Sequence, residues 1–92
     1  MKVVIIGSGY VGLVTGGCFA DMGVDVCCVD IDKQKVERLR QGHVPIYEPE
    51  LQSIVERNLQ AGRLSFACSA EECMDGVDAV FIAVGTPPGE DG

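Results

Sequence analysis

The chain has 92 residues, which is the length of one small domain or of part of one. Its residues are 47% hydrophobic and 23% charged, a composition that predicts a folded core and excludes disordered and collagen-like chains. Seven Lys and Arg against fourteen Asp and Glu give a net charge of -7, which repels phosphate backbones and anionic lipid surfaces. We therefore expect neither nucleic acid nor a membrane as a partner.

The cysteines are odd in number, five in all, and show neither C-x-x-C spacing nor a second pair of metal ligands. This pattern is typical of free thiols in a reducing compartment, so we expect a cytoplasmic protein without a metal site. The apolar stretch after Lys2 also has a faint likeness to a secretory or lipoprotein signal, but Gly7, Gly9 and Gly12 interrupt it.

The first half of the chain alternates between two periods. Residues 2–6 form a β-branched run that predicts a strand buried on both faces. Residues 10–22 predict a helix that stops at Gly23, and the apolar residues at helical spacing predict its packed face: Val11, Val14, Thr15, Cys18, Phe19 and Met22. Residues 25–30 return to a strand, with Cys27 and Cys28 on opposite faces.

The second half continues the same alternation. Asp32 is a predicted cap for a short helix that ends at Arg40, and after a loop residues 50–61 form an amphipathic helix. Residues 64–68 and 78–84 predict strands, separated by a short helix that a capping box at 69–72 begins. The order predicts an α/β fold with a Rossmann-type, doubly wound parallel sheet, of which the chain holds the first half and the next strand.

One motif carries chemistry. Residues 7–12 match G-x-G-x-x-G between a predicted strand and a predicted helix, and Asp30 ends the next strand. Gly7 would make the tight turn, Gly9 would let the backbone approach a diphosphate, and Gly12 would let the helix pack closely on the sheet. The helix N-terminus then attracts the anion, which an acidic protein needs. The alternative is a set of turn glycines without a ligand.

The glycine motif with the later Asp30 is typical of dinucleotide-binding domains. Three further residues are candidates for contact with such a dinucleotide cofactor. The Asp30 carboxylate favours NAD over NADP, because it accepts bonds from ribose hydroxyls and repels a 2'-phosphate; alternatively, it only ends a strand. Lys35 can reach the ribose or a phosphate, or it is simply solvated. Thr86 follows the last predicted strand and would flank the ligand crevice, unless it belongs to a plain proline-directed turn.

Several segments together resemble the N-terminal NAD-binding region of the UDP-glucose/GDP-mannose dehydrogenase family. They are residues 1–23, VDID at 29–32, PIYEPEL at 45–51, GRLSF at 62–66 and FIAVGTPPGEDG at 81–92, so the resemblance covers essentially the whole chain. It implies that Val11, Asp30, Lys35 and Thr86 contact NAD. The predicted cofactor-binding set is then Gly7, Gly9, Tyr10, Val11, Gly12, Asp30, Lys35 and Thr86.

The resemblance also implies a reaction. Two successive hydride transfers to NAD would oxidise the C6 alcohol of UDP-glucose to the carboxylate of UDP-glucuronate, through a thiohemiacetal on a cysteine. In the family that cysteine, its assisting residues and the UDP-sugar site lie outside the region that residues 1–92 resemble. We therefore expect an incomplete NAD-binding domain over 1–92, with no catalytic residue of its own and no turnover alone, from an enzyme that is a homo-oligomer.

Alternatives stay open at this point. They are a related member that oxidises GDP-mannose or a UDP-N-acetylhexosamine, and a non-catalytic NAD-binding regulatory module. One departure from the family pattern also needs a structural answer, because Glu50 stands where the family usually has glycine.

Overall fold

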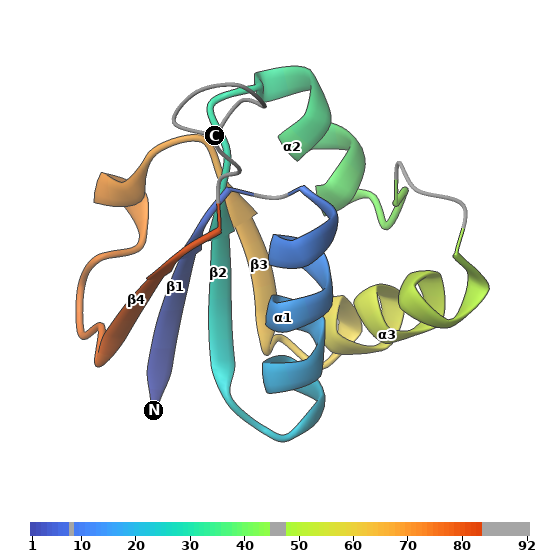
Figure 1. The fold of residues 1–92 in the computed structure, drawn as a ribbon, viewed down its shortest axis with the longest axis horizontal. Helices are drawn as coiled ribbons and strands as arrows, with labels where there is room; N and C mark the ends of the chain where they lie inside the picture. Colours follow the sequence, from blue (N-terminus) through green and yellow to red (C-terminus); the bar gives the residue numbers. More distant parts are fainter. Residues whose placement is uncertain (8, 45–47, 84–92) are drawn as a thin grey trace, which may run out of the picture.

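A computed structural model of the chain describes residues 1–7, 9–44 and 48–83 (Figure 1). The predicted turn at 85–88, and Thr86 with it, lies outside these residues. The elements in chain order are β1 (Lys2–Ile6), α1 (Tyr10–Asp21), β2 (Asp25–Val29), α2 (Lys33–Arg40), α3 (Pro49–Gln60), β3 (Leu64–Ala67), the 3-10 turn η1 (Ala70–Glu72) and β4 (Ala79–Ile82). The predicted order is confirmed, and where the structure describes them the predicted ends are exact or off by at most two residues.

The strands of the described part form one parallel sheet in the order β3-β2-β1-β4. In this register Val4 of β1 lies opposite Cys27 of β2 and Val80 of β4. The predicted fold class, with the fourth strand beside the first, is confirmed. Because the chain crosses from β3 to the far side of β1, the strand order reverses next to β1, which is where ligands bind in open parallel sheets.

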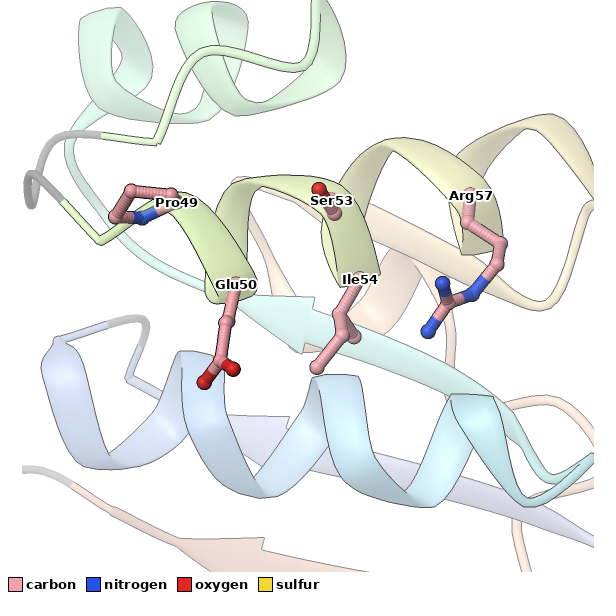
Figure 2. A pocket seen from close by; sticks show the side chains of 5 residues that line it. All are labelled: Pro49, Glu50, Ser53, Ile54 and Arg57. Atoms are coloured by element: carbon pink, nitrogen blue, oxygen red, sulfur yellow. The ribbon is translucent and has the colours of Figure 1, made fainter.

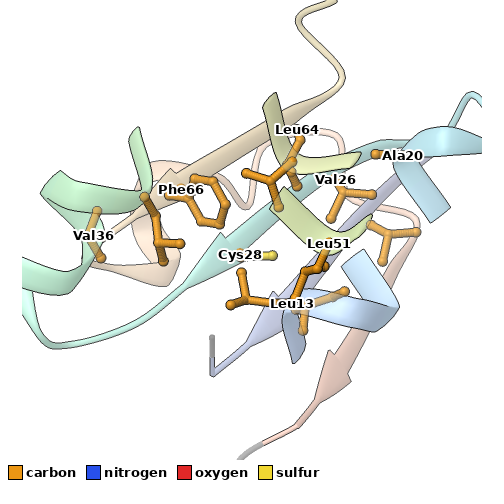
Figure 3. Packing of buried hydrophobic residues seen from close by; sticks show 12 residues of the cluster. Leu13, Ala20, Val26, Cys28, Val36, Leu51, Leu64 and Phe66 are labelled. Atoms are coloured by element: carbon orange, nitrogen blue, oxygen red, sulfur yellow. The ribbon is translucent and has the colours of Figure 1, made fainter. Parts of the chain in front are cut away.

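The three helices in the described residues share one face of the sheet. Leu13 of α1, Val36 of α2 and Leu51 of α3 belong to one buried cluster with Cys28 and Phe66 from the strands (Figure 3). The other face carries a smaller cluster that includes Cys27. Cys27 and Cys28 therefore lie on opposite faces, as predicted.

The predicted packed face of α1 is wrong in part. Val14 and Phe19 pack against the core, but three of the six predicted residues are exposed: Val11, Cys18 and Met22. Small residues take their place. A β-carbon on Gly16 would lie 2.9 Å from Cys28 Sγ, and one on Gly17 would lie 3.0 Å from Ile54 Cγ2. The helix thus packs closely on the sheet and on α3 through its glycines, which the apolar period alone cannot reveal.

Helices α2 and α3 both begin at residues whose types favour a helix N-terminus. The Asp32 Oδ1 atom accepts hydrogen bonds from the backbone N–H groups of Gln34 at 3.1 Å and Lys35 at 3.2 Å, so the predicted cap of α2 is confirmed. Helix α3 begins at Pro49, and Glu50 lies in its first turn. A helical backbone suits glutamate, and the helix dipole favours an acidic side chain there, so this departure from the family pattern fits the fold.

A buried amide joins α1 to α3. Asn58 is fully buried, and its Nδ2 donates to Asp21 Oδ1 at 3.2 Å and to the Ile54 carbonyl at 2.9 Å. Its Oδ1 accepts from two nitrogens of Arg63, at 3.1 and 2.9 Å, and Arg63 Nε also donates to the Ala20 carbonyl at 2.8 Å. These bonds hold the C-terminal end of α1 in place, and the sequence patterns did not predict them.

Strand β4 is an edge of the described sheet. Its apolar side chains are partly exposed, with Val80 at 43%, Phe81 at 42% and Ile82 at 74%. The Phe81 ring lies 5.5 Å, centroid to centroid, from the ring of Phe19 on α1. Among the described helices, none has the length and apolar character to cross a lipid bilayer.

Candidate functional site

The glycine turn joins the ends of two strands. Gly7 follows β1 directly, and its N–H donates to the carbonyl of Val29, the last residue of β2, at 2.6 Å. Its φ of +102° lies in the left-handed region, where residues other than glycine are strained. The predicted turn is therefore present, and it lies against the strand that leads to Asp30.

Gly12 packs the first turn of α1 against that loop. A β-carbon at position 12 would lie 2.1 Å from the Gly7 carbonyl oxygen and 3.6 Å from Ala83 Cβ. Ala83 itself follows β4 and donates from its N–H to the Ile6 carbonyl at 2.9 Å. Glycine is thus required at position 12 by the fold, and the ends of β1 and β4 meet at this point.

Gly9 differs from Gly7 and Gly12 in both backbone conformation and packing. Its φ of -74° and ψ of -172° are extended backbone that any residue adopts, and a β-carbon there would meet no atom of residues 1–7, 11–44 or 48–83 within 4 Å. Neither the backbone conformation nor packing against the described residues therefore requires glycine at this position. The open space adjoins the N-terminus of α1, where the first N–H groups of a helix lack partners within the helix and carry partial positive charge.

These residues fit a diphosphate. The N-cap of α1 is Gly9, which has no side-chain oxygen to cap the helix, and the first turn contains no acidic residue. Val11 in that turn is 63% exposed. Tyr10 begins the helix. The space that a side chain at Gly9 would fill is open for an anion from outside the chain.

Asp30 and Lys35 are brought together beside this turn. Asp30 follows β2, and its Oδ2 lies 3.3 Å from Lys35 Nζ, with exposed side-chain fractions of 16% for Asp30 and 29% for Lys35. Its Oδ1 accepts a hydrogen bond from the backbone N–H of Asp32 at 2.9 Å. The sequence analysis predicted that both residues lie near the ribose of the cofactor. It did not predict the contact between them, because Asp30 follows a strand and Lys35 lies five positions later, on the next helix.

Burial keeps two of the cysteines in the thiol form. Burial raises the pKa of the Cys28 thiol to about 12, and burial together with a hydrogen bond to Cys27 raises that of Cys73 to about 12. Both thiols therefore stay protonated at neutral pH. Cys18 is exposed on the middle of α1, and Cys68 is partly buried after β3.

A surface pocket of about 490 Å³ lies along α3, on the side that faces α1. Figure 2 shows Glu50, Ile54 and Arg57 pointing from α3 towards α1. Its lining includes none of the predicted cofactor-binding residues, and Arg57 is held by Asp21 at 2.9 Å. This pocket is therefore separate from the predicted cofactor-binding residues.

The comparison with known families decides the identity of the domain. Residues 1–92 match the UDP-glucose/GDP-mannose dehydrogenase family, NAD binding domain. The chain belongs to this family. NAD is therefore the cofactor of the domain, and the Rossmann-type fold and the resemblance stated above are confirmed.

Individual relatives agree with the family. The chain is 55% identical over its whole length to UDP-glucose 6-dehydrogenase of Pseudomonas aeruginosa, of which it covers 20%. Among solved structures, a UDP-glucose dehydrogenase from Pyrobaculum islandicum has a TM-score of 0.88 at 50% identity, covering 98% of this chain and 21% of that one. A ternary complex of GDP-mannose dehydrogenase from Pseudomonas aeruginosa has a TM-score of 0.91 at 38% identity, covering 100% and 21%.

The chain thus spans about a fifth of the length of the curated relatives that it matches. The fold positions seven of the eight predicted cofactor-binding residues within the described part of the chain, and Thr86 falls outside it. That each of these eight residues contacts NAD stays a prediction.

Proposed function

We propose that this chain is the NAD-binding part of an enzyme that oxidises UDP-glucose to UDP-glucuronate and uses two NAD. Relatives that carry the name UDP-glucose 6-dehydrogenase, at 55% and 52% identity, support UDP-glucose as the substrate. A GDP-mannose dehydrogenase and two UDP-N-acetylmannosamine dehydrogenases of known structure are less similar, at 38% identity or below.

One observation carries the assignment of the site: among the described residues the space at Gly9 is open, at the N-terminus of α1 and in the turn that is bonded to the end of β2. In the proposed site, backbone N–H groups of residues 9–12 bind the diphosphate of NAD. Asp30 accepts hydrogen bonds from the adenosine ribose hydroxyls. Lys35 adds a positive charge beside Asp30, and Thr86 completes the predicted set.

Bound NAD supplies a hydride acceptor, and the residues of this chain bind and orient it. The catalytic nucleophile and the UDP-sugar site would belong to the rest of the enzyme. The thiols described here support this division, since Cys27, Cys28 and Cys73 are buried and Cys18 is exposed beside α3, away from the glycine turn.

We also propose a cytoplasmic location and a homo-oligomeric enzyme. The five free thiols of the described chain support a reducing compartment. The homo-oligomer rests on the family resemblance alone, and sedimentation of the enzyme that carries this chain tests it.

The experiment is a pair of measurements on the purified chain and on the complete enzyme that carries it. Calorimetric titration of the chain should show NAD binding, and the chain mixed with NAD and UDP-glucose should form no NADH. The complete enzyme should form NADH from UDP-glucose faster than from GDP-mannose. A chain that binds no NAD, or an enzyme that prefers GDP-mannose, would overturn the proposal.

A further inference from the structure

Asp32 makes hydrogen bonds to both Asp30 and Lys35. Its backbone N–H donates to Asp30 Oδ1 at 2.9 Å. Its own carboxylate caps α2 by accepting from the N–H groups of Gln34 and Lys35, at 3.1 and 3.2 Å. Lys35 then returns to Asp30 through its ammonium group at 3.3 Å. The three residues close a ring in which Asp32 holds both partners of the ion pair.

The cap fixes the geometry of this ring. Asp32 adopts extended backbone, with φ -79° and ψ 102°, and the helix begins at the next residue. A capping side chain favours this conformation, which aims the Asp32 N–H at Asp30 and starts α2 in the direction that brings Lys35 back to Asp30. Without the cap, the first turn of α2 frays, and both contacts to Asp30 lose their fixed donor positions.

We propose that Asp32 is a positioning residue for NAD, which sets the selectivity for NAD over NADP by capping α2 and so orienting Asp30 and Lys35. This inference rests on the proposed function of the site. It assigns the role of Asp32 to its cap geometry and not to its charge. Asp32 is exposed, and interactions between exposed charges are weakened by water and salt, whereas the cap contacts are direct.

Three variants of the chain separate geometry from charge. Asp32→Ala removes the cap and the charge, whereas Asp32→Asn removes the charge and keeps a side chain that caps helices as well as aspartate does. Ser69→Ala is the matched control, because the Ser69 side chain caps η1 by accepting from the Glu71 N–H at 3.2 Å, at another turn of the fold. For each variant, calorimetry gives the Kd for NAD and for NADP, and urea unfolding gives the stability.

We expect Asp32→Ala to weaken NAD binding about three- to tenfold and to lower the ratio of NADP Kd to NAD Kd by a similar factor, the scale of one lost hydrogen bond. Asp32→Asn should keep the wild-type ratio within about twofold, and Ser69→Ala should lower stability with the ratio unchanged. Hydrogen exchange of the Gln34 and Lys35 amides should speed up in Asp32→Ala and not in Asp32→Asn.

The outcomes separate this inference from the proposed function. If Asp32→Asn shifts the ratio as much as Asp32→Ala, charge and not geometry is responsible, and the inference is wrong. It is also wrong if Asp32→Ala keeps the wild-type ratio while its amides exchange faster. If the wild-type chain binds no NAD, the proposed function itself fails, and the inference fails with it.

Discussion

The carbonyl oxygen of Gly7 occupies the place where a side chain on Gly12 would begin, since a β-carbon there would stand 2.1 Å from that oxygen. Gly7 is itself restricted to glycine by its φ of +102°. One glycine is thus required by conformation and the other by space, and together they fix α1 against the end of β1. The glycine turn is part of the fold before any ligand arrives.

Gly12→Ala should therefore destabilise the chain, although alanine is by about 1 kcal/mol the better helix former. The clash is with backbone, which yields less than a flexible side chain, so we expect a net loss of about 1–3 kcal/mol in the free energy of unfolding. Urea unfolding followed by circular dichroism measures it. Gly9→Ala is the control and should unfold near the wild-type midpoint. Equal midpoints for wild type and Gly12→Ala would contradict the packing described here.

Gly9→Val should abolish NAD binding and leave the fold intact. The backbone at Gly9 accepts any residue, and a β-carbon there meets no atom of the described part of the chain within 4 Å, so we expect the added side chain to obstruct an incoming ligand and not the fold. We expect stability within about 1 kcal/mol of wild type, the scale of changes at a helix N-cap. Calorimetric titration measures NAD binding, and circular dichroism shows whether the fold is intact. Retained binding would show that the diphosphate does not lie at Gly9.

The wild-type chain should bind NAD more than about tenfold tighter than NADP, because a charge-assisted hydrogen bond contributes about 1.5–3 kcal/mol. Asp30→Ala should weaken NAD binding and reduce this preference. It removes the carboxylate that repels the 2'-phosphate and leaves Lys35, now without its 3.3 Å partner, to attract that phosphate. Asp25→Ala, an exposed carboxylate at the opposite end of β2, is the charge-matched control. Equal or tighter NADP binding by the wild type would refute the role of Asp30.

Stability should fall at acid pH in part through Asp21. Hydrogen bonds from Asn58 and Arg57 hold the pKa of the Asp21 carboxyl below its ordinary value of 3.8. Because the folded-state pKa is lowered, this contribution is full above about pH 4 to 5 and is lost as pH falls through the folded pKa. Unfolding by urea at a series of pH values should show a weaker acid dependence for Asp21→Asn.

A double mutant with Arg57→Gln tests whether the bond from Arg57 lowers the pKa of Asp21. In an Arg57→Gln background, the Asp21→Asn change should alter the acid dependence less, because one of the bonds that lower the pKa is already gone. An acid dependence that stays the same in Asp21→Asn would remove Asp21 from the explanation.

Asn58→Ala should lower the free energy of unfolding by about 1–3 kcal/mol, because it removes several hydrogen bonds of one fully buried amide at once. The Arg63 guanidinium and the Asp21 carboxylate lose the amide that joins them, while Arg63 keeps its bond to the Ala20 carbonyl and Asp21 keeps its bond to Arg57. Gln60→Ala, an exposed position on the same helix, should change stability little. A neutral Asn58→Ala variant would show that the amide network contributes nothing net.

Much of the fold followed from local patterns along the chain. The β-branched run of β1 and the Asp32 cap of α2 each depend on neighbouring residues, and both were predicted correctly. The glycine fingerprint and Asp30 were also visible as spacing. Each of these features is determined by residues that are close together in the sequence. A short segment is therefore sufficient to predict each of them.

What only the tertiary structure decided involves residues that are distant in sequence or small in size. The packed face of α1 was mispredicted because Gly16 and Gly17 make close contacts without contributing any apolar signal. The Asn58 network depends on Asp21, 37 positions away, and a polar residue within a helix gives no sign that it will be buried. The ring through Asp32, Asp30 and Lys35 likewise needs the direction in which α2 leaves β2. Side-chain partners of this kind are chosen by how elements pack in space, and a sequence read along the chain does not contain that geometry explicitly.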